Sequence, residues 1–339
     1  MDKAFESIGV IGGGAWGTAL ATVAGTNGAA VTIWAREPEV VESINQGHTN
    51  SEFLPGIALG KNIRATVDLA EATAADALLL AVPAQFVRGM TTEMAEHLAP
   101  ATPVVICAKG IERESGALMS DVLQETLPKA LGAVLSGPTF AAEVARGQPT
   151  AVTLACSDDD VGTALVQRLG GRAFRPYLAA DIIGAQVGGA VKNVLAIACG
   201  IVAGRELGDN ARAALITRGM AEMMRFGQAL GAAPQTLMGL CGLGDLVLTC
   251  TGAASRNFSL GVAVGQGADL DDYLGNRKTV AEGVFTASAT VARAATADVA
   301  MPIAAAVDAI VQGRVSVDEA IDGLLSRPFK IEDRDRLID

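Results

Sequence analysis

A glycine turn near the N-terminus is the first segment whose residue types and spacing could do chemistry. Gly12, Gly14 and Gly17 form the pattern G-x-G-x-x-G directly after an apolar run at residues 7–11. In such turns the first glycine permits a tight turn, the second admits the pyrophosphate, and the third lets helix and strand pack closely. A helix that begins in the turn also directs its free N–H groups at the phosphates. Because the pattern lies between an expected strand and an expected helix, it predicts a dinucleotide site rather than a merely flexible loop.

The residue that follows the expected second strand bears on which dinucleotide is bound. Enzymes strict for NAD usually place an Asp or Glu there, against the ribose 2′-hydroxyl. This chain has Arg36 followed by Glu37. Arg36 could pair with a 2′-phosphate, or it could be a solvated surface arginine. We therefore expect NADP to be accepted at least as well as NAD.

Hydride transfer at a carbinol also needs a group that exchanges the hydroxyl proton. Lys192 lies in the run VGGAVKN inside an otherwise apolar segment at residues 182–204. Burial there would lower the pKa of its ammonium group toward neutrality, which suits acid/base work. The alternative is a lysine that extends its charged end to solvent. The neighbouring glycines and Asn193 favour close approach to a ligand, whereas His48 and His97 lie in settings that suit catalysis poorly.

Other polar groups follow expected strands or lie in glycine-rich loops. Lys109-Gly110 follows the apolar run at residues 104–108, and Ser136-Gly137-Pro138-Thr139 follows another strand-like run. Ligands in parallel sheets bind at such carboxyl ends. Farther along, Gly242-Leu243-Gly244-Asp245 precedes Ser255-Arg256-Asn257. An arginine beside neutral donors suits a phosphate group. Each of these segments alone could equally be an ordinary loop.

Composition narrows the class of protein. The net charge of 26 − 37 = −11 disfavours binding to a nucleic-acid backbone. The five cysteines are widely spaced without a C-x-x-C pair, so we expect neither a metal site nor disulfides, but buried thiols of a cytoplasmic protein. The N-terminus is too short and charged for a signal peptide. Residues 182–204 have membrane-like length, but Lys192 near their centre indicates a buried helix and no transmembrane segment.

The order of apolar segments predicts an α/β fold. Strand-length runs at residues 7–11, 31–34, 78–82, 104–108, 134–136 and 151–155 alternate with helical segments, as in a parallel sheet covered on both faces. After about residue 180, Ala, Met and Leu at helical spacing dominate. We predict an N-terminal Rossmann-type doubly wound sheet at residues 1–180, which binds the dinucleotide. A mainly helical C-terminal domain at residues 181–339 would carry the substrate and catalytic groups.

Taken together, these segments resemble a known family. The ordered blocks IGGGAWGTALA, FLPG, AKGIE, SGPTFAAEVA, QVGGAVKNVLAI, NARAALITRGMAEM, GLGDLVLTCTG with SRN, and VAEG resemble bacterial-type NAD(P)-dependent sn-glycerol-3-phosphate dehydrogenases over nearly the whole chain. The resemblance implies reversible hydride transfer between NAD(P)H and dihydroxyacetone phosphate, a small phosphorylated three-carbon substrate. It also implies a supply of sn-glycerol 3-phosphate for phospholipid synthesis.

The resemblance also assigns roles to individual residues. It implies that Lys192 is the general acid/base. The substrate would be held by Lys109, Gly137, Thr139, Lys192, Asp245, Ser255, Arg256 and Asn257. The dinucleotide would be lined by Gly12, Gly14, Ala15, Trp16, Gly17, Arg36, Phe53, Lys109, Ala141, Arg256, Val280 and Glu282. Two positions depart from many relatives: Gly13 stands where many have alanine in the turn, and Phe258 stands where a basic residue is frequent. Residues 269–278 receive no role.

Two other functions compete with this interpretation. A β-hydroxyacid, ketopantoate or 6-phosphogluconate dehydrogenase would share the two-domain layout and a Lys-Asn helix. The SGPTF and GLGD…SRN blocks favour the glycerol phosphate enzymes. The second alternative is a non-catalytic dinucleotide sensor. Such a protein would need neither Lys192 nor the phosphate-binding group Ser255-Arg256-Asn257. A homodimer is a further expectation, because the helical half is so apolar.

Overall fold

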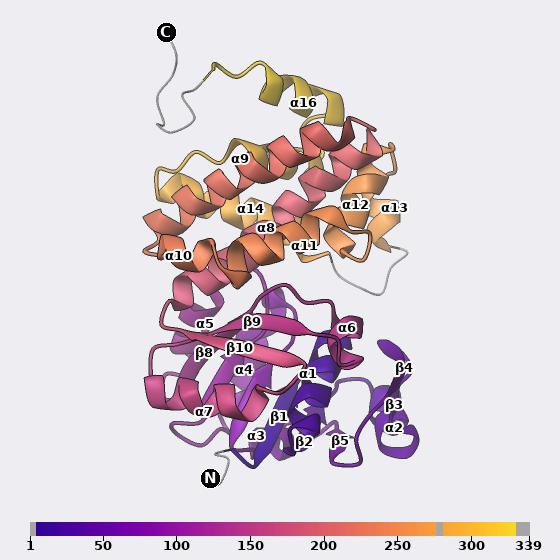
Figure 1. Cartoon of the computed structure of the whole chain (residues 1–339), viewed down its shortest axis with the longest axis vertical. Coiled ribbons are helices and arrows are strands. Elements are labelled where there is room, and N and C mark those ends of the chain that lie inside the picture. The colour runs from indigo at the N-terminus through magenta and orange to yellow at the C-terminus, as the bar shows by residue number, and fades with distance from the viewer. Residues whose placement is uncertain (1–4, 276–280, 330–339) are drawn as a thin grey trace.

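The computed structural model of the chain describes residues 5–275 and 281–329. It places a sheet with flanking helices below and a bundle of helices above, with α8 running between them (Figure 1). The strands are β1 (Ser7–Ile11), β2 (Ala30–Trp34), β3 (Thr49–Asn50), β4 (Leu54–Ala58), β5 (Ile63–Thr66), β6 (Ala77–Leu80), β7 (Pro103–Ile106), β8 (Leu131–Ser136), β9 (Thr150–Cys156) and β10 (Phe174–Ala179).

The first helices connect these strands. They are α1 (Ala15–Thr26), α2 (Pro38–Gly47), α3 (Leu69–Thr73), η1 (Ala84–Phe86), α4 (Val87–Met94), α5 (Met119–Thr126), α6 (Ala141–Ala145) and α7 (Asp159–Leu169). From residue 182 the described chain is helical. Its helices are α8 (Ile182–Gly204), α9 (Gly208–Ala229), α10 (Pro234–Leu237), η2 (Leu240–Gly244), α11 (Asp245–Thr251), α12 (Arg256–Gly265), α13 (Leu270–Gly275), α14 (Glu282–Thr296), α15 (Pro302–Val311) and α16 (Val317–Leu325).

The main sheet has eight strands in the order β10-β9-β8-β7-β6-β1-β2-β5. Chain order reverses at β1, because β2 pairs with one edge of β1 and β6 with the other. Such a switch point opens a crevice at the carboxyl ends of the strands. The predicted Rossmann-type doubly wound sheet and the helical C-terminal part are thereby confirmed. The sheet is mostly parallel, as expected, but β9 departs from this, since it pairs antiparallel with β8, and β10 runs parallel to β9.

The glycine turn lies at this switch point. The Gly12 N–H donates to the Trp34 carbonyl at 3.0 Å, which ties the turn to the end of β2. A Cβ on Gly17 would lie 2.0 Å from the Gly12 carbonyl oxygen, so that position tolerates only glycine. A Cβ on Gly14, the N-cap of α1, would meet nothing within 4 Å. The start of α1 is therefore open for a ligand.

Helix α8 is the centre of the helical part. Gly200 and Gly261 let α8 and α12 cross closely, because a Cβ on either would lie 2.1 Å from a backbone oxygen of the other helix. By length and composition α8 could also cross a membrane, but 83% of the window that passes this test is buried inside the protein. Side chains of α8 instead build one hydrophobic core together with those of α9, α11, α12 and α14.

Candidate active site

Two lysines and one aspartate form the centre of the candidate site. The Lys192 ammonium group on α8 donates to Asp245 Oδ1 at 2.6 Å and to Thr249 Oγ1 at 2.9 Å. The Lys109 ammonium group donates to Asp245 Oδ2 at 2.7 Å and to the Gly137 carbonyl at 2.8 Å. The carboxylate of Asp245 thus joins a lysine from the end of the sheet to a lysine from the helical part.

The local sequence explains why these groups can meet. Gly188 and Gly189 precede Lys192 by about one turn of α8. A Cβ on Gly188 would lie 2.3 Å from the Cys241 carbonyl oxygen in η2. A Cβ on Gly189 would lie 2.8 Å from Ser136 Oγ and 3.3 Å from Lys109 Cγ. The two glycines therefore let α8 press against both the GLGD segment and the carboxyl ends of β7 and β8.

Burial shapes the protonation of Lys192, which is 6% exposed. Desolvation lowers the pKa of this lysine to about 8, while the Asp245 carboxylate opposes the shift and the Lys109 charge adds to it. Lys192 has three N–H donors, of which two reach Asp245 and Thr249. The third is left for a ligand oxygen. The solvent-extended alternative for this lysine was wrong.

A chain of amides connects this centre to neighbouring elements. Asn193 Nδ2 donates to the Lys109 carbonyl at 3.3 Å, and Asn257 Nδ2 donates to Asn193 Oδ1 at 3.0 Å. The Gly283 N–H at the start of α14 donates to Asn257 Oδ1 at 3.0 Å. The chain holds α8, α12 and α14 in fixed register around Lys109.

Three of the expected ligand groups lie at helix starts on the helical side. Ser255 caps α12 by accepting a hydrogen bond from the Phe258 N–H at 3.2 Å. Arg256, the first residue of α12, is exposed, and within residues 5–275 and 281–329 it forms no hydrogen bond or ion pair. Glu282 accepts a hydrogen bond from the Ala84 N–H at 3.0 Å. Burial raises the pKa of Glu282, whereas the charges of Arg256, Lys109 and Lys192 oppose this rise. These cations therefore act on one common region, which would attract an anion although the whole chain is acidic.

Four of the residues expected to line the dinucleotide pack against the hydrophobic core of the sheet half. They are the partly buried Ala15, Trp16, Phe53 and Ala141, and the core they contact also contains residues of β1, β2 and α1. The indole N–H of Trp16 is buried and has no hydrogen-bond partner in the described chain. Arg36 lies two residues after the end of β2, and its guanidinium donates to Glu37 Oε1 at 2.8 Å. Val280 lies outside the described residues.

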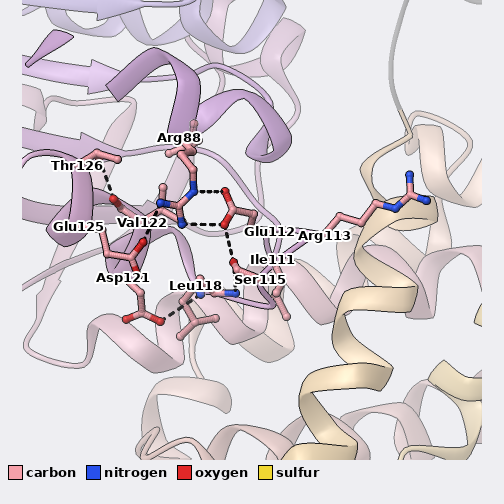
Figure 2. A network of polar contacts seen from close by, with 12 residues as sticks. Arg88, Ile111, Glu112, Arg113, Ser115, Leu118, Asp121, Val122, Glu125 and Thr126 are labelled. Atoms are coloured by element: carbon pink, nitrogen blue, oxygen red, sulfur yellow. Dashed lines mark hydrogen bonds and ion pairs between the residues drawn. The ribbon is translucent and has the colours of Figure 1, made fainter. Parts of the chain in front are cut away.

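The loop that carries Lys109 is fixed by an ion-pair network (Figure 2). Arg88 on α4 donates to both carboxylate oxygens of Glu112, at 2.9 and 2.8 Å, and pairs with Glu125 on α5 at 2.7 Å. Ser115 donates to the same Glu112 carboxylate. The hydrogen bonds from Arg88 hold the pKa of Glu112 below its usual range. Because Glu112 follows Lys109 by three residues, the network restrains the backbone from which Lys109 extends.

Sequence reasoning gave no role to one residue of this centre, Thr249. Thr249 binds the Lys192 ammonium group and lies one helical turn after Asp245 on α11. The i, i+4 spacing between Asp245 and Thr249 was the available signal in the sequence.

No described group of three or more His, Cys, Asp or Glu residues could hold a metal ion. All five cysteines are buried and free.

The fold and this centre define a dehydrogenase of the Rossmann class, and comparison with known proteins gives the family. Residues 7–162 match the NAD-dependent glycerol-3-phosphate dehydrogenase N-terminus, and residues 181–322 match its C-terminus. This chain belongs to the NAD-dependent glycerol-3-phosphate dehydrogenase family. The family resemblance inferred from the sequence is thereby confirmed.

Individual relatives agree over the whole chain. The glycerol-3-phosphate dehydrogenase [NAD(P)+] of Parvibaculum lavamentivorans is 58% identical over 98% of this chain and 100% of its own length. The crystal structure of glycerol-3-phosphate dehydrogenase from Coxiella burnetii has a TM-score of 0.91 at 37% identity, covering 95% of this chain and 99% of that one. A ketopantoate reductase from Ralstonia eutropha has a TM-score of 0.58 at 16% identity, covering 90% of this chain and 97% of that one. The last similarity shows a shared fold alone.

Proposed function

We propose that this chain catalyses reversible hydride transfer between NAD(P)H and dihydroxyacetone phosphate to give sn-glycerol 3-phosphate. The observation that carries the proposal is the buried Lys192–Asp245–Lys109 cluster, in which one carboxylate joins a lysine from the end of the sheet to a lysine of the helical part. Lys192 would give its proton to the ketone oxygen as hydride arrives from the nicotinamide, and would take it back in the reverse direction. The nicotinamide supplies the hydride.

The remaining residues would bind and orient the ligands. Lys109, Gly137, Thr139 and Asp245 would hold the three-carbon unit, and Ser255, Arg256 and Asn257 would hold its phosphate end. Binding energy from the phosphate would orient the distant ketone carbon for hydride transfer. The dinucleotide would lie over the glycine turn against Ala15, Trp16, Phe53, Ala141 and Glu282, with Arg256 and Val280 at its nicotinamide half.

A substrate panel tests this function. Oxidation of NADPH by the purified chain, followed by absorbance, should be fast with dihydroxyacetone phosphate and negligible with ketopantoate and small β-ketoacids. A faster reaction with ketopantoate would support the rival dehydrogenase class. Tight binding of NADPH without turnover of any of these ketones would support the sensor alternative.

The proposal extends to the domain division, the location, the use of the product and the oligomeric state of the enzyme. We propose a division at about residue 180, since β10 ends at Ala179, α8 begins at Ile182 and the C-terminal family model begins at residue 181. A cytoplasmic location fits the free, buried cysteines. A role in supplying phospholipid synthesis follows from the product. A homodimer through the helical part fits its exposed apolar side chains, among them Leu207 and Met238.

Arg256 provides a test of phosphate binding. Charge-assisted hydrogen bonds contribute about 1.5–3 kcal/mol, so Arg256→Ala should raise the KM for dihydroxyacetone phosphate about tenfold to a hundredfold. Turnover of unphosphorylated dihydroxyacetone should suffer little further loss. Arg64→Ala, at the far edge of the sheet, removes a similar exposed arginine as a control. A normal KM in Arg256→Ala would exclude the phosphate contact.

Arg36 provides a test of cofactor choice. Its side chain is 78% exposed and is held only by the adjacent Glu37, so a 2′-phosphate could displace that carboxylate. We therefore propose that NADP is used at least as well as NAD. Arg36→Ala should raise the KM for NADPH about tenfold and leave that for NADH nearly unchanged, whereas Glu37→Gln should favour NADPH. An unchanged NADPH affinity in Arg36→Ala would remove Arg36 from this role.

A further inference from the structure

Asn50 is a fully buried polar residue to which the proposed mechanism gives no role. Its side chain is 0% exposed. The Nδ2 atom donates to the Gly13 carbonyl at 2.8 Å and to Thr18 Oγ1 at 2.8 Å, and Oδ1 accepts from the Phe53 N–H at 3.0 Å. A carbonyl can only accept and a backbone N–H can only donate, so these partners fix the orientation of the amide. Both Nδ2 protons and the oxygen are thus engaged.

The three partners belong to two separate parts of the dinucleotide region. Gly13 and Thr18 belong to the glycine turn and the first turns of α1, whereas Phe53 lies in the turn between β3 and β4. Strand β4 packs against α1 and α6. The hairpin is anchored on its other side, because Ser43 Oγ on α2 donates to the Thr49 carbonyl at 2.8 Å. The Asn50 amide is a direct hydrogen-bonded connection between this hairpin and the glycine turn.

We propose that Asn50 is a positioning residue for dinucleotide binding. It holds the backbone of Phe53, a residue expected to line the dinucleotide, at a fixed distance from the glycine turn. The inference rests on the proposed cofactor site. Asn50 donates a hydrogen bond to the Gly13 carbonyl, whose oxygen carries partial negative charge. This carbonyl adjoins Gly14, where the open start of α1 would receive a phosphate group. Without Asn50, both the turn and the Phe53 backbone would have to be ordered when the cofactor binds, which weakens affinity.

The effect on binding must be separated from an effect on stability. Asn50→Ala leaves a buried carbonyl, hydroxyl and N–H without partners, which destabilises any protein. Asn45 offers a matched control. Its side chain donates to the Ala65 carbonyl at 2.9 Å and accepts from the Ala65 N–H at 2.8 Å. That amide bridges α2 to β5 in the same part of the fold, but without contact to the glycine turn.

The experiment compares the dissociation constant for NADPH among wild type, Asn50→Ala and Asn45→Ala, alongside thermal unfolding. Trp16 and Trp34 are the only tryptophans and both adjoin the turn, so quenching of tryptophan fluorescence reports binding without substrate. Asn50→Ala should raise this constant about tenfold. Its kcat at saturating NADPH should stay within about threefold of wild type. Asn45→Ala should lower the unfolding temperature without changing the dissociation constant.

A second variant covers the case in which Asn50→Ala does not fold. Asn50→Asp preserves side-chain volume and the bond from the Phe53 N–H, but it cannot donate to the Gly13 carbonyl as a carboxylate, so it should also weaken NADPH binding. A wild-type dissociation constant in either folded variant, or an equal shift in Asn45→Ala, would overturn the proposal. Failure of the wild type to reduce dihydroxyacetone phosphate would instead contradict the proposed function, because the binding measurement involves no substrate.

Discussion

Replacing Lys192 with alanine should lower the turnover number about 10²-fold or more, while the protein stays folded. The expected loss follows from the geometry, since Lys192 has an N–H left for a substrate oxygen and the pKa of its ammonium group is lowered to about 8. No other described lysine shares this contact with both Asp245 and Thr249. Lys109, the nearest alternative, directs its ammonium group at Asp245 and at the Gly137 carbonyl.

Steady-state kinetics and circular dichroism of Lys192→Ala would measure this loss. Alanine removes a charge that burial disfavours, and it also leaves Asp245 with only Lys109 as its cationic partner. A modest change in stability is therefore expected in either direction. Turnover close to that of wild type in a folded variant would exclude Lys192 as the acid/base.

Replacing Asp245 with asparagine should impair both activity and stability. The Asp245 carboxylate is 0% exposed and compensates two ammonium groups, so its loss leaves buried positive charge without a partner. Breaking a buried ion pair in this way costs about 3–5 kcal/mol of folding free energy. The pKa of Lys192 should fall further, because the attraction that opposes desolvation is lost. We expect kcat/KM to fall about 10²-fold.

Glu222→Gln is a matched control for Asp245→Asn. Glu222 is likewise buried, at 1% exposed, and it accepts hydrogen bonds from the Ile303 and Ala304 N–H groups at the start of α15. Its replacement should change the free energy of unfolding in urea while leaving kcat/KM nearly unchanged. If Asp245→Asn and Glu222→Gln affect kcat/KM equally, Asp245 has a structural role alone.

Strong local patterns made much of the fold predictable. The apolar run at residues 182–204 coincides with α8, and the runs at residues 7–11 and 31–34 lie in β1 and β2. Strand β10 was not predicted, because it lies at the edge of the sheet and exposes Tyr177 and Leu178. The antiparallel pairing of β9 was also missed, since strand direction depends on the path of the chain through α6 rather than on apolar pattern.

The site was predictable in its residue types but not in its contacts. Lys192 and Lys109 stood out because charge is unusual in apolar, glycine-rich runs. Their shared partner Asp245 is 53 positions from Lys192 and 136 from Lys109, so only the tertiary structure shows that one carboxylate serves both. The amide of Asn50 was overlooked in a polar loop, because its burial depends on the packing of the β3–β4 hairpin against α1.

The pH dependence of kcat/KM in both directions tests the central claim, which is that Lys192 exchanges a proton with the substrate oxygen. The second pKa of a phosphate is about 6, so between about pH 7 and 9.5 the substrate keeps one charge state while Lys192 titrates near 8. Reduction of dihydroxyacetone phosphate requires the ammonium form, so its kcat/KM should fall above about pH 8. Oxidation of sn-glycerol 3-phosphate requires the neutral amine, so its kcat/KM should rise to a plateau above that pH. Profiles that are flat in this range, or that persist unchanged in Lys192→Ala, would contradict the claim.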